Sequence, residues 1–235
     1  MNLLIIIPAY NEENSITAVV EDIKRYCPEY DYLIINDGSL DSTAKLCREK
    51  GYCLLDLPVN LGLTGAFQAG MLYAYEHGYD AVMQFDGDGQ HKAEYVRALV
   101  NKLLSGYDIV IGSRFVTVKK PITLRMAGSF FISFAIRFTT RLKICDPTSG
   151  MRIFNRGIME RFISDPNYAP EPDTISFLIR CGARVSEVQV EVSERKTGKS
   201  YFTFFKSVSY MAQVILSIFL IQWFRRNDLK GNKHD

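Results

Sequence analysis

The 235-residue sequence predicts an α/β fold in which helices flank a mostly parallel sheet. Short aliphatic segments alternate with segments of helical periodicity through about residue 112, which is the pattern of β-α units joined by right-handed crossovers. The first aliphatic run, residues 3–7, is unbroken, as expected for a parallel strand covered on both faces. With 47% hydrophobic and 23% charged residues, the chain is globular and can bury a full core.

The first 112 residues contain the elements that define this alternation. Ile16, Val19 and Ile23 recur at helical spacing after the first strand. Ser39 or Asp41 can cap the helix that follows the second strand. We expect strands at residues 3–7, 32–35, 53–57, 81–85 and 109–111, and helices at residues 12–26, from the cap to about 50, from a glycine-rich turn at 60–65 to 77, and at 94–104.

The pattern changes after residue 112. Residues 126–141 predict an amphipathic helix rich in phenylalanine and arginine. Such a helix either lies in a membrane interface or packs on the core with a solvated basic face. Residues 146–156 are polar and turn-like and then helical, residues 173–181 predict a helix, and residues 184–192 alternate like an edge or hairpin strand.

Residues 207–224 contain no charged side chain. A helix of this length reaches about 27 Å, which is marginal for a hydrocarbon core of about 30 Å. Because serine and glutamine side chains dilute the segment, we favour a helix that lies in the membrane plane or packs on a partner over a true span. A soluble core helix is the remaining alternative. We expect residues 227–235 to be disordered.

Charge and cysteine content exclude several classes of protein. A net charge of +2 gives no strong indication of nucleic-acid binding, although positive charge is concentrated in the second half. The five cysteines are scattered and form no C-x-x-C pair, so we expect neither a disulfide framework nor a zinc site. We expect the protein to reside in a reducing cytosol. The N-terminus lacks the basic and long apolar regions of a signal peptide.

Two carboxylates, Asp86 and Asp88, stand one residue apart just after the apolar run 81–83. If this run is a strand, both side chains leave its end on the same side. Two hard oxygen ligands at this spacing suit Mg²⁺ or Mn²⁺, and a bound phosphate can complete the shell. The alternative is an acidic turn, since Asp-Gly pairs form turns. His91 is either a further ligand or, as we favour, a residue that orients the loop.

The position of this loop favours the metal. Polar clusters at residues 8–13, 36–41 and 86–91 each follow a predicted strand. In parallel sheets, ligands bind beyond the carboxyl ends of the strands, so the three clusters are expected to meet at one rim.

Four motifs stand out: Ile-Pro-Ala-Tyr-Asn-Glu-Glu at residues 7–13, Asn-Asp-Gly-Ser-Leu-Asp-Ser-Thr at 36–43, Asp-Gly-Asp at 86–88 with Gln90 and His91, and Gly-Ser-Arg at 112–114. Together they resemble the GT-A glycosyltransferases of family 2. The later motifs at 146–152 and 194–200 resemble the dolichol-phosphate mannose synthase branch, which includes bacterial polyprenyl-phosphate glycosyltransferases. The resemblance covers roughly residues 3 to 205.

The resemblance implies a role for each matching residue. Asp88, Arg114, Arg125 and Arg195 would be the catalytic residues, with Arg114 near the donor or the transferred phosphate. The donor nucleotide-sugar would be held by Pro8, Tyr10, Glu12, Ile35, Asp37, Asp86 and Gly87, the metal by Asp86, Asp88 and Gln90, and the acceptor phosphate by Arg125, Ser129, Arg195 and Ser200.

The sequence departs from the family pattern at three places. Asn36 stands where a first aspartate is common, and Lys92-Ala93 replaces a common double proline. Tyr201 follows Ser200 where the family has lysine, which weakens the acceptor assignment at that point. Longer relatives also carry two clear transmembrane helices after the catalytic domain.

The implied domain organisation has three parts. Residues 1–205 would form a GT-A catalytic domain, with a nucleotide-sugar-binding half (1–112) and an acceptor-binding half (113–205). Residues 206–226 would form a membrane-associated or oligomerising helix, and 227–235 a disordered tail.

The implied activity is inverting, metal-dependent transfer of a sugar to a polyprenyl phosphate, giving a lipid-linked donor for cell-envelope glycans. UDP-N-acetylglucosamine or UDP-glucose is favoured over GDP-mannose. The enzyme would act at the cytoplasmic face of the cell membrane, attached peripherally or by one marginal helix, with a small membrane protein or a second copy as partner.

Two alternatives stay open. A family 2 enzyme acting on a glycan or another non-lipid acceptor would need a carboxylate base, for which Asp146 or Glu171 is the candidate. A non-catalytic nucleotide-sugar-binding scaffold at the membrane is the second.

Overall fold

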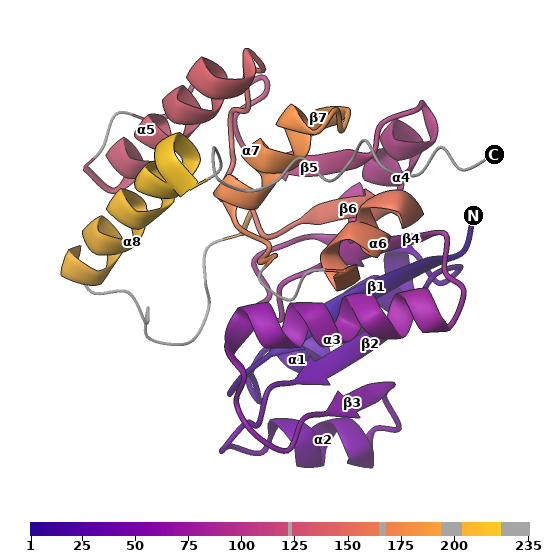
Figure 1. Ribbon diagram of the computed structural model, residues 1–235. Coiled ribbons are helices and arrows are strands. Elements are labelled where there is room, and N and C mark those ends of the chain that lie inside the picture. The colour runs from indigo at the N-terminus through magenta and orange to yellow at the C-terminus, as the bar shows by residue number, and fades with distance from the viewer. Residues whose placement is uncertain (122–123, 165–167, 194–203, 222–235) are drawn as a thin grey trace.

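The computed structural model describes residues 1–121, 124–164, 168–193 and 204–221 (Figure 1). It confirms the α/β class: the described residues form a seven-stranded sheet of order β3-β2-β1-β4-β6-β5-β7. The strands are β1 (Leu3–Ala9), β2 (Asp31–Asn36), β3 (Leu54–Asp56), β4 (Ala81–Gln84), β5 (Ile109–Ser113), β6 (Arg152–Asn155) and β7 (Val185–Gln189).

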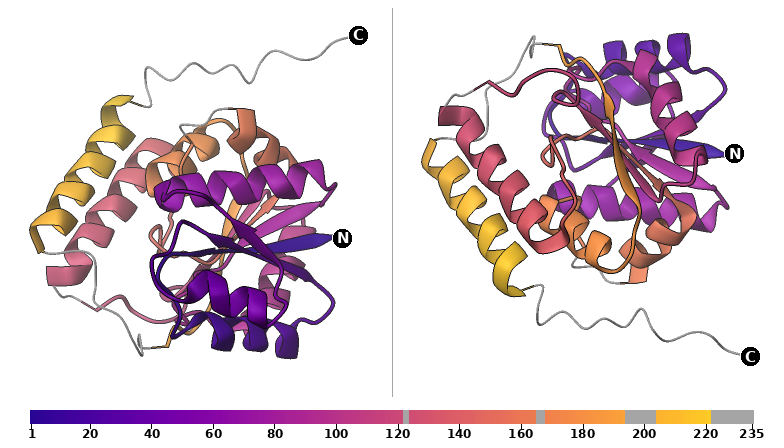
Figure 2. Two further views of the ribbon diagram at one scale, coloured as in Figure 1. Left: turned by 90° about the horizontal axis from the view of Figure 1, so that it is seen from below. Right: turned by 90° about the horizontal axis from the view of Figure 1, so that it is seen from above.

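Helices cover both faces of this sheet (Figure 2). The alternating residues of β1 explain why, since Leu3 and Ile5 pack with α1, α2 and α4, whereas Leu4 and Ile6 pack with α3, α6 and α7. The helices are α1 (Ile16–Tyr26), α2 (Thr43–Glu49), α3 (Gly62–Glu76), α4 (Val96–Leu104, after a 3₁₀ turn at Ala93–Tyr95), α5 (Leu124–Thr140), α6 (Arg156–Ser164), α7 (Pro172–Arg180) and α8 (Phe204–Leu216).

One strand was not predicted. Residues 146–156 were expected to be turn-like and then helical, but β6 pairs antiparallel with β4 on one side and β5 on the other. The strand is short and begins with a charged residue, Arg152, whose burial the pattern of residue types does not reveal. The edge strand expected at 184–192 is confirmed, and it pairs parallel with β5.

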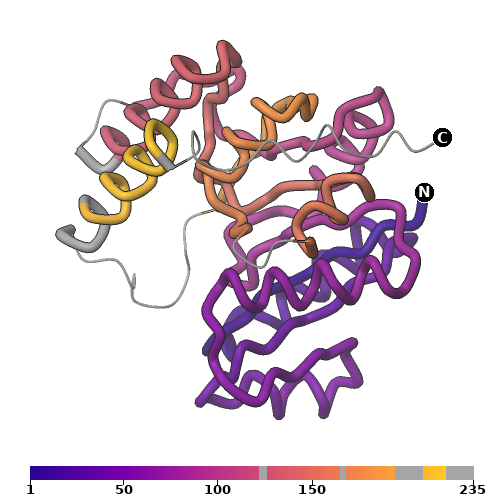
Figure 3. Tube along the Cα trace, in the orientation of Figure 1, coloured from indigo at the N-terminus to yellow at the C-terminus, as the bar shows by residue number. Residues whose placement is uncertain are grey.

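The C-terminal helix α8 packs beside α5 at one flank of the molecule (Figure 3). Val214 and Ile218 join the core cluster that also contains Ile132 and Ile136 of α5. The helix ends in a π-helical turn, Ser217–Ile221. In the part of the chain that the structure describes, no helix has both the length and the apolar character needed to cross a membrane. The expected disordered tail, 227–235, lies outside the described residues.

Candidate active site

The predicted polar clusters meet at the carboxyl ends of β1, β2 and β4. In the β1–β2 ladder Ala9 lies opposite Asn36, and the Asp37 N–H donates to the Ala9 carbonyl at 2.9 Å. A Cβ added to Gly87 would lie 3.0 Å from the Pro8 carbonyl oxygen. The loop that carries the two aspartates therefore lies directly against the end of β1, as the strand order predicts.

Hydrogen bonds hold the carboxylates of this loop, residues 86–91. The Asp86 carboxylate accepts from the Gln84 amide at 3.2 Å on one oxygen and lies 3.2 Å from His91 Nε2 on the other. Asp88 accepts the N–H of Gln90 at 3.0 Å. Burial raises the pKa of the Asp86 carboxyl, but His91, Gln84 and the nearby Arg152 outweigh burial, so that its pKa lies below the usual range. His91 is buried beside this carboxylate, and its role in orienting the loop stays a prediction.

Gly150 brings the second half of the chain onto this loop. A Cβ at position 150 would overlap the Asp86 carboxylate, so no larger residue fits there without displacing that side chain. The motif at 146–152 is thus in direct contact with the predicted metal loop.

Arg114 and Asp146 form a bidentate ion pair beside this contact. Arg114 donates to the two Asp146 oxygens at 2.6 and 2.8 Å, and Asp146 is fully buried. The pair raises the pKa of Arg114. Glu187 supports it, because its carboxylate accepts the N–H groups of Cys145 and Asp146 at 2.7 and 2.8 Å. The charge of Arg114 is thus engaged by Asp146, and its contact with the donor or the transferred phosphate stays a prediction.

Arg152 is a buried residue whose role was not predicted. Its guanidinium donates to the carbonyls of Pro147 at 2.7 Å and Pro170 at 2.6 Å. In the β4–β6 ladder it lies opposite Gln84, the residue that donates to Asp86. Arg152 therefore ties two loops to the strand that leads into residues 86–91. The indication of this role in the sequence was the presence of an arginine inside the 146–152 motif.

The predicted nucleoside-binding residues have different environments. Asp37 is buried and accepts the Leu61 N–H at 2.7 Å, so it anchors the segment before α3. Ile35 is fully buried beneath α3, with its side chain against Gly70, and its contact with the nucleoside stays a prediction. Glu12 accepts from Ser15 at 2.6 Å, and Pro8 and Tyr10 are partly exposed at the rim.

The predicted acceptor-phosphate residues are only partly described. Ser129 is buried on α5 and accepts a hydrogen bond from Lys120 Nζ at 2.6 Å. Arg125 belongs to α5, but its side chain is outside the described set, as are residues Arg195 and Ser200 entirely. Ser193, just before that segment, donates its N–H to the Gln90 carbonyl at 2.9 Å. Ser193 therefore lies beside the 86–91 loop.

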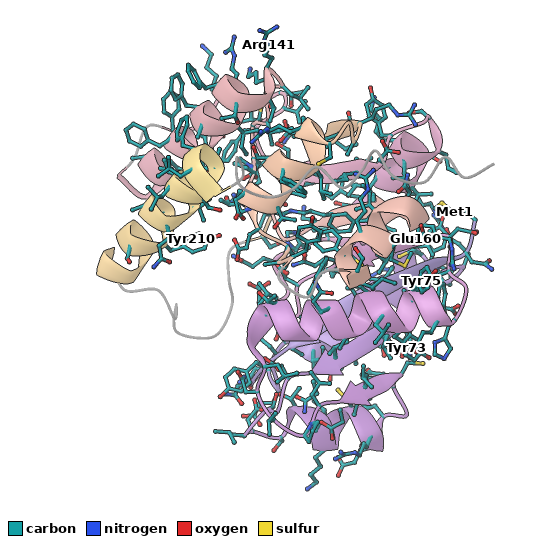
Figure 4. All side chains as sticks on the ribbon, viewed as in Figure 1. Met1, Tyr73, Tyr75, Arg141, Glu160 and Tyr210 are labelled. Atoms are coloured by element: carbon teal, nitrogen blue, oxygen red, sulfur yellow. The ribbon has the colours of Figure 1, made fainter. Side chains whose placement is uncertain are left out.

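Two polar contacts fasten α8 to the start of α7. Tyr210, labelled on α8 in Figure 4, donates to the Glu171 carboxylate, and Ser217 donates to Asp173 at 2.6 Å. Burial raises the pKa of Glu171. The two candidates for a general base in a non-lipid glycosyltransferase are therefore both engaged, Asp146 by Arg114 and Glu171 by Tyr210.

The donor set at the rim fits a hard divalent cation. Within the described ranges, no three or more histidine, cysteine, aspartate or glutamate side chains are grouped to hold a metal. Asp86 and Asp88 supply two partly exposed carboxylates. The Gln90 side-chain amide donates to the Ser193 carbonyl at 3.5 Å. This suits an ion such as Mg²⁺, which keeps several waters and takes its remaining ligands from a bound phosphate.

Comparison with known proteins agrees with the fold. The model of the family Glycosyl transferase family 2 matches residues 4–163. The chain is a family 2 glycosyltransferase with a GT-A-like fold. Among curated relatives, it is 30% identical to a polyprenol monophosphomannose synthase of Mycolicibacterium smegmatis, over 84% of this chain and 79% of the relative.

The names of two other relatives also contain a polyprenyl or dolichyl phosphate. The chain is 31% identical to an undecaprenyl-phosphate mannosyltransferase of Micrococcus luteus, over 85% of this chain and 87% of that one. It is 29% identical to a UDP-N-acetylglucosamine–dolichyl-phosphate N-acetylglucosaminyltransferase of Methanococcus voltae, over 67% and 71% of the two chains.

Solved structures show the same fold. Glucosyl-3-phosphoglycerate synthase from Mycobacterium tuberculosis, in complex with Mn²⁺ and uridine-diphosphate-glucose, aligns with a TM-score of 0.65 at 17% identity. The alignment covers 94% of this chain and 78% of that one. At this identity the likeness concerns the fold alone.

Proposed function

We propose that this glycosyltransferase moves a sugar from a nucleotide-sugar, UDP-N-acetylglucosamine or UDP-glucose, to a polyprenyl phosphate. The observation that carries the proposal is the contact of Gly150 with Asp86. Through it, the motif that resembles polyprenyl-phosphate transferases lies on the loop that would hold the donor diphosphate. The names of the three relatives, all transferases to a polyprenyl or dolichyl phosphate, support the acceptor class.

The state of the carboxylates favours a phosphate acceptor over a hydroxyl acceptor. A hydroxyl nucleophile needs a general base, and a phosphate monoester is already ionised at neutral pH. Asp146 is fully buried in its pair with Arg114, and Glu171 is bound to Tyr210. Direct attack by a phosphate oxygen would break the bond between the sugar and the diphosphate and invert the anomeric centre.

Asp86 and Asp88 would hold Mg²⁺ or Mn²⁺, with the Gln90 side chain close by. When bound, the metal supplies positive charge that stabilises the departing diphosphate. His91 and Gln84 keep the Asp86 carboxylate ionised and oriented for this ion. The Mn²⁺ and the uridine nucleotide in the structural neighbour support a divalent ion and a UDP-sugar.

The lipid acceptor calls for contact with a membrane, and α5 and α8 offer an apolar surface for it. We define this aromatic face by its exposed side chains: Phe130, Phe131, Phe134 and Phe138 of α5, Leu216 of α8, and Leu220 of the π turn. Arg141, with its basic side chain, lies at the outer end of α5 (Figure 4). Exposed aromatic side chains beside basic residues suit an anionic membrane surface. We propose peripheral attachment at the cytoplasmic face, alone or with a membrane-protein partner or a second copy.

A donor panel tests the proposal. Purified protein, undecaprenyl phosphate in detergent micelles and Mn²⁺ or Mg²⁺ are incubated with radiolabelled UDP-glucose, UDP-N-acetylglucosamine or GDP-mannose. We expect label from a UDP-sugar to partition into organic solvent as a product that mild acid releases. Label that stays in the aqueous phase with every donor, or that moves to a soluble glycan instead, would contradict it.

A further inference from the structure

Lys120 lies in the connection between β5 and α5, half-buried, with its ammonium directed at neutral groups. Nζ donates to Ser129 Oγ at 2.6 Å and to the Cys145 carbonyl at 3.1 Å. The Phe115 ring lies 5.3 Å away. None of the ion pairs formed among the described residues includes Lys120. Half-buried cations are normally paired with an anion, so this one is suited to receive one.

The nearby acidic groups are already engaged. Asp146 is held by Arg114, and Glu187 accepts the N–H groups of Cys145 and Asp146. Burial and the charge of the nearby Arg114 together lower the pKa of Lys120 more than Asp146, Cys145 and Glu187 raise it. An additional anion bound at Nζ would offset the cost of burying this charge.

The location of Lys120 matches the chemistry of a lipid phosphate. On one side, Cys145 begins the short loop that ends at Gly150, against Asp86. On the other side, Ser129 is buried on α5, and the two residues after it, Phe130 and Phe131, belong to the exposed aromatic face. An anion at Lys120 and Ser129 would lie between the donor site and the surface that faces the membrane.

We propose that Lys120 binds the phosphate of the lipid acceptor. The phosphate oxygens would accept hydrogen bonds from Nζ and from Ser129 Oγ, in place of the direct Lys120–Ser129 contact. Lysine is suited to this because its ammonium has three donors and a flexible stem. The acceptor class rests on the proposed function, whereas the assignment of Lys120 rests on its own contacts and charge.

The test compares neutral and charged residues at position 120. Lys120→Gln removes the charge and keeps an N–H donor for the Cys145 carbonyl, and Lys120→Arg keeps the charge. We expect Lys120→Gln to raise the KM for undecaprenyl phosphate by roughly 10- to 100-fold, the value of a hydrogen bond to a charged group. The KM for the nucleotide-sugar should change less than twofold, and Lys120→Arg should recover most of the acceptor affinity.

Lys119 provides the matched control, because it is adjacent in sequence and exposed. Lys119→Gln should leave the acceptor KM within about twofold of the original protein. Equal effects of the two glutamine variants, an unchanged acceptor KM in Lys120→Gln, or a parallel rise of both substrate KM values would overturn the assignment. If Lys120→Gln does not fold, competition of inorganic phosphate with the acceptor is measured in Lys120→Met and Lys120→Arg.

The two levels of the proposal fail differently. If the original protein forms no lipid-linked sugar with any donor, the proposed function fails. If it forms the product and the position-120 variants behave like the Lys119 control, only the role of Lys120 fails.

Discussion

Gly150 lies against the Asp86 carboxylate so closely that even a methyl group would collide with it. These two residues come from opposite halves of the chain, and their contact joins the 86–91 loop to the 146–152 motif. The contact is tight on the carboxylate side because Gln84 and His91 already hold both oxygens of Asp86. There is little freedom for Asp86 to move aside.

We therefore expect Gly150→Ala to reduce sugar transfer by roughly 100-fold or more, since a displacement of about 1 Å at a catalytic group has an effect of that size. The Mn²⁺ concentration needed for half-maximal activity should rise as well. Steady-state kinetics over a Mn²⁺ series measures both quantities. Gly157→Ala is the control, because Gly157 is exposed on α6 and has only one atom within contact distance of an added Cβ. Equal activity of the two variants would contradict the role of Gly150.

The metal assignment predicts the effect of neutralising Asp88. Asp88→Asn keeps the shape of the side chain and removes its charge, so transfer should fall by roughly 100- to 1,000-fold while the thermal midpoint of unfolding changes little. Chelation with EDTA should abolish the activity of the original protein, and Mn²⁺ or Mg²⁺ should restore it. Asp80→Asn, at an exposed position beyond α3, should keep full activity. Undiminished transfer by Asp88→Asn in EDTA would exclude the metal site.

The contact between Tyr210 and Glu171 predicts a dependence of stability on pH. Because burial raises the pKa of Glu171 in the folded protein, the fold binds this proton more tightly than the unfolded chain does. The corresponding stability is present below the ordinary carboxyl pKa of 4.5 and is lost as the pH rises through the raised value. In Glu171→Gln, the stability should fall less as the pH rises, and at neutral pH this variant should be at least as stable as the original protein. Thermal unfolding from mildly acidic to neutral pH measures it, and identical pH profiles would argue against a buried Glu171.

Removing the hydroxyl of Tyr210 tests the same contact from the other side. Tyr210→Phe should destabilise the protein by about 1–3 kcal/mol, because Glu171 remains buried without this donor. In the Glu171→Gln variant, Tyr210→Phe should lower the stability by less, because the neutral side-chain amide depends less than a carboxylate on the tyrosine hydroxyl as a donor. A double-mutant cycle from urea unfolding gives the coupling, and strictly additive effects would mean that α8 is held by other contacts.

The aromatic face predicts a loss of membrane binding when it is made polar. Replacing Phe130, Phe131 and Phe134 together with serine should weaken sedimentation with anionic liposomes by roughly 100-fold, given about 1.5–3 kcal/mol for each fully buried phenylalanine and less for partial insertion. Turnover of a short, water-soluble prenyl phosphate should stay close to its original value. Leu104→Ser, at an exposed position at the end of α4, is the control. Unchanged sedimentation of the triple variant would place membrane contact elsewhere.

Residue pattern alone predicted most of the first half of the fold and the meeting of its polar clusters. The strands there are continuous aliphatic runs, and parallel connectivity brings their carboxyl ends to one rim. The later elements were harder, because β6 begins with the buried charge of Arg152. Its burial depends on the carbonyls of Pro147 and Pro170, which no local pattern encodes.

Two features of the site depend on contacts between distant segments. Lys120 could be read only as one of several basic residues, until the fold placed Ser129 and the Cys145 carbonyl at its ammonium. Likewise, α8 could be read as an isolated apolar helix, whereas its serine and tyrosine bind the start of α7. In this helix, polar side chains that dilute an apolar pattern make specific contacts.

The insertion of β6 between β4 and β5 has a consequence for how the chain reaches its native state. Strands β4 and β5 are not neighbours, so the sheet stays open until residues 152–155 arrive from the second half. A fragment that stops at residue 112 would leave β4 as a bare hydrophobic edge and β5 without a partner, which favours aggregation. The first and second halves of the chain therefore share one cooperative folding unit, and late, long-range pairing at the centre of the sheet is expected to slow its formation.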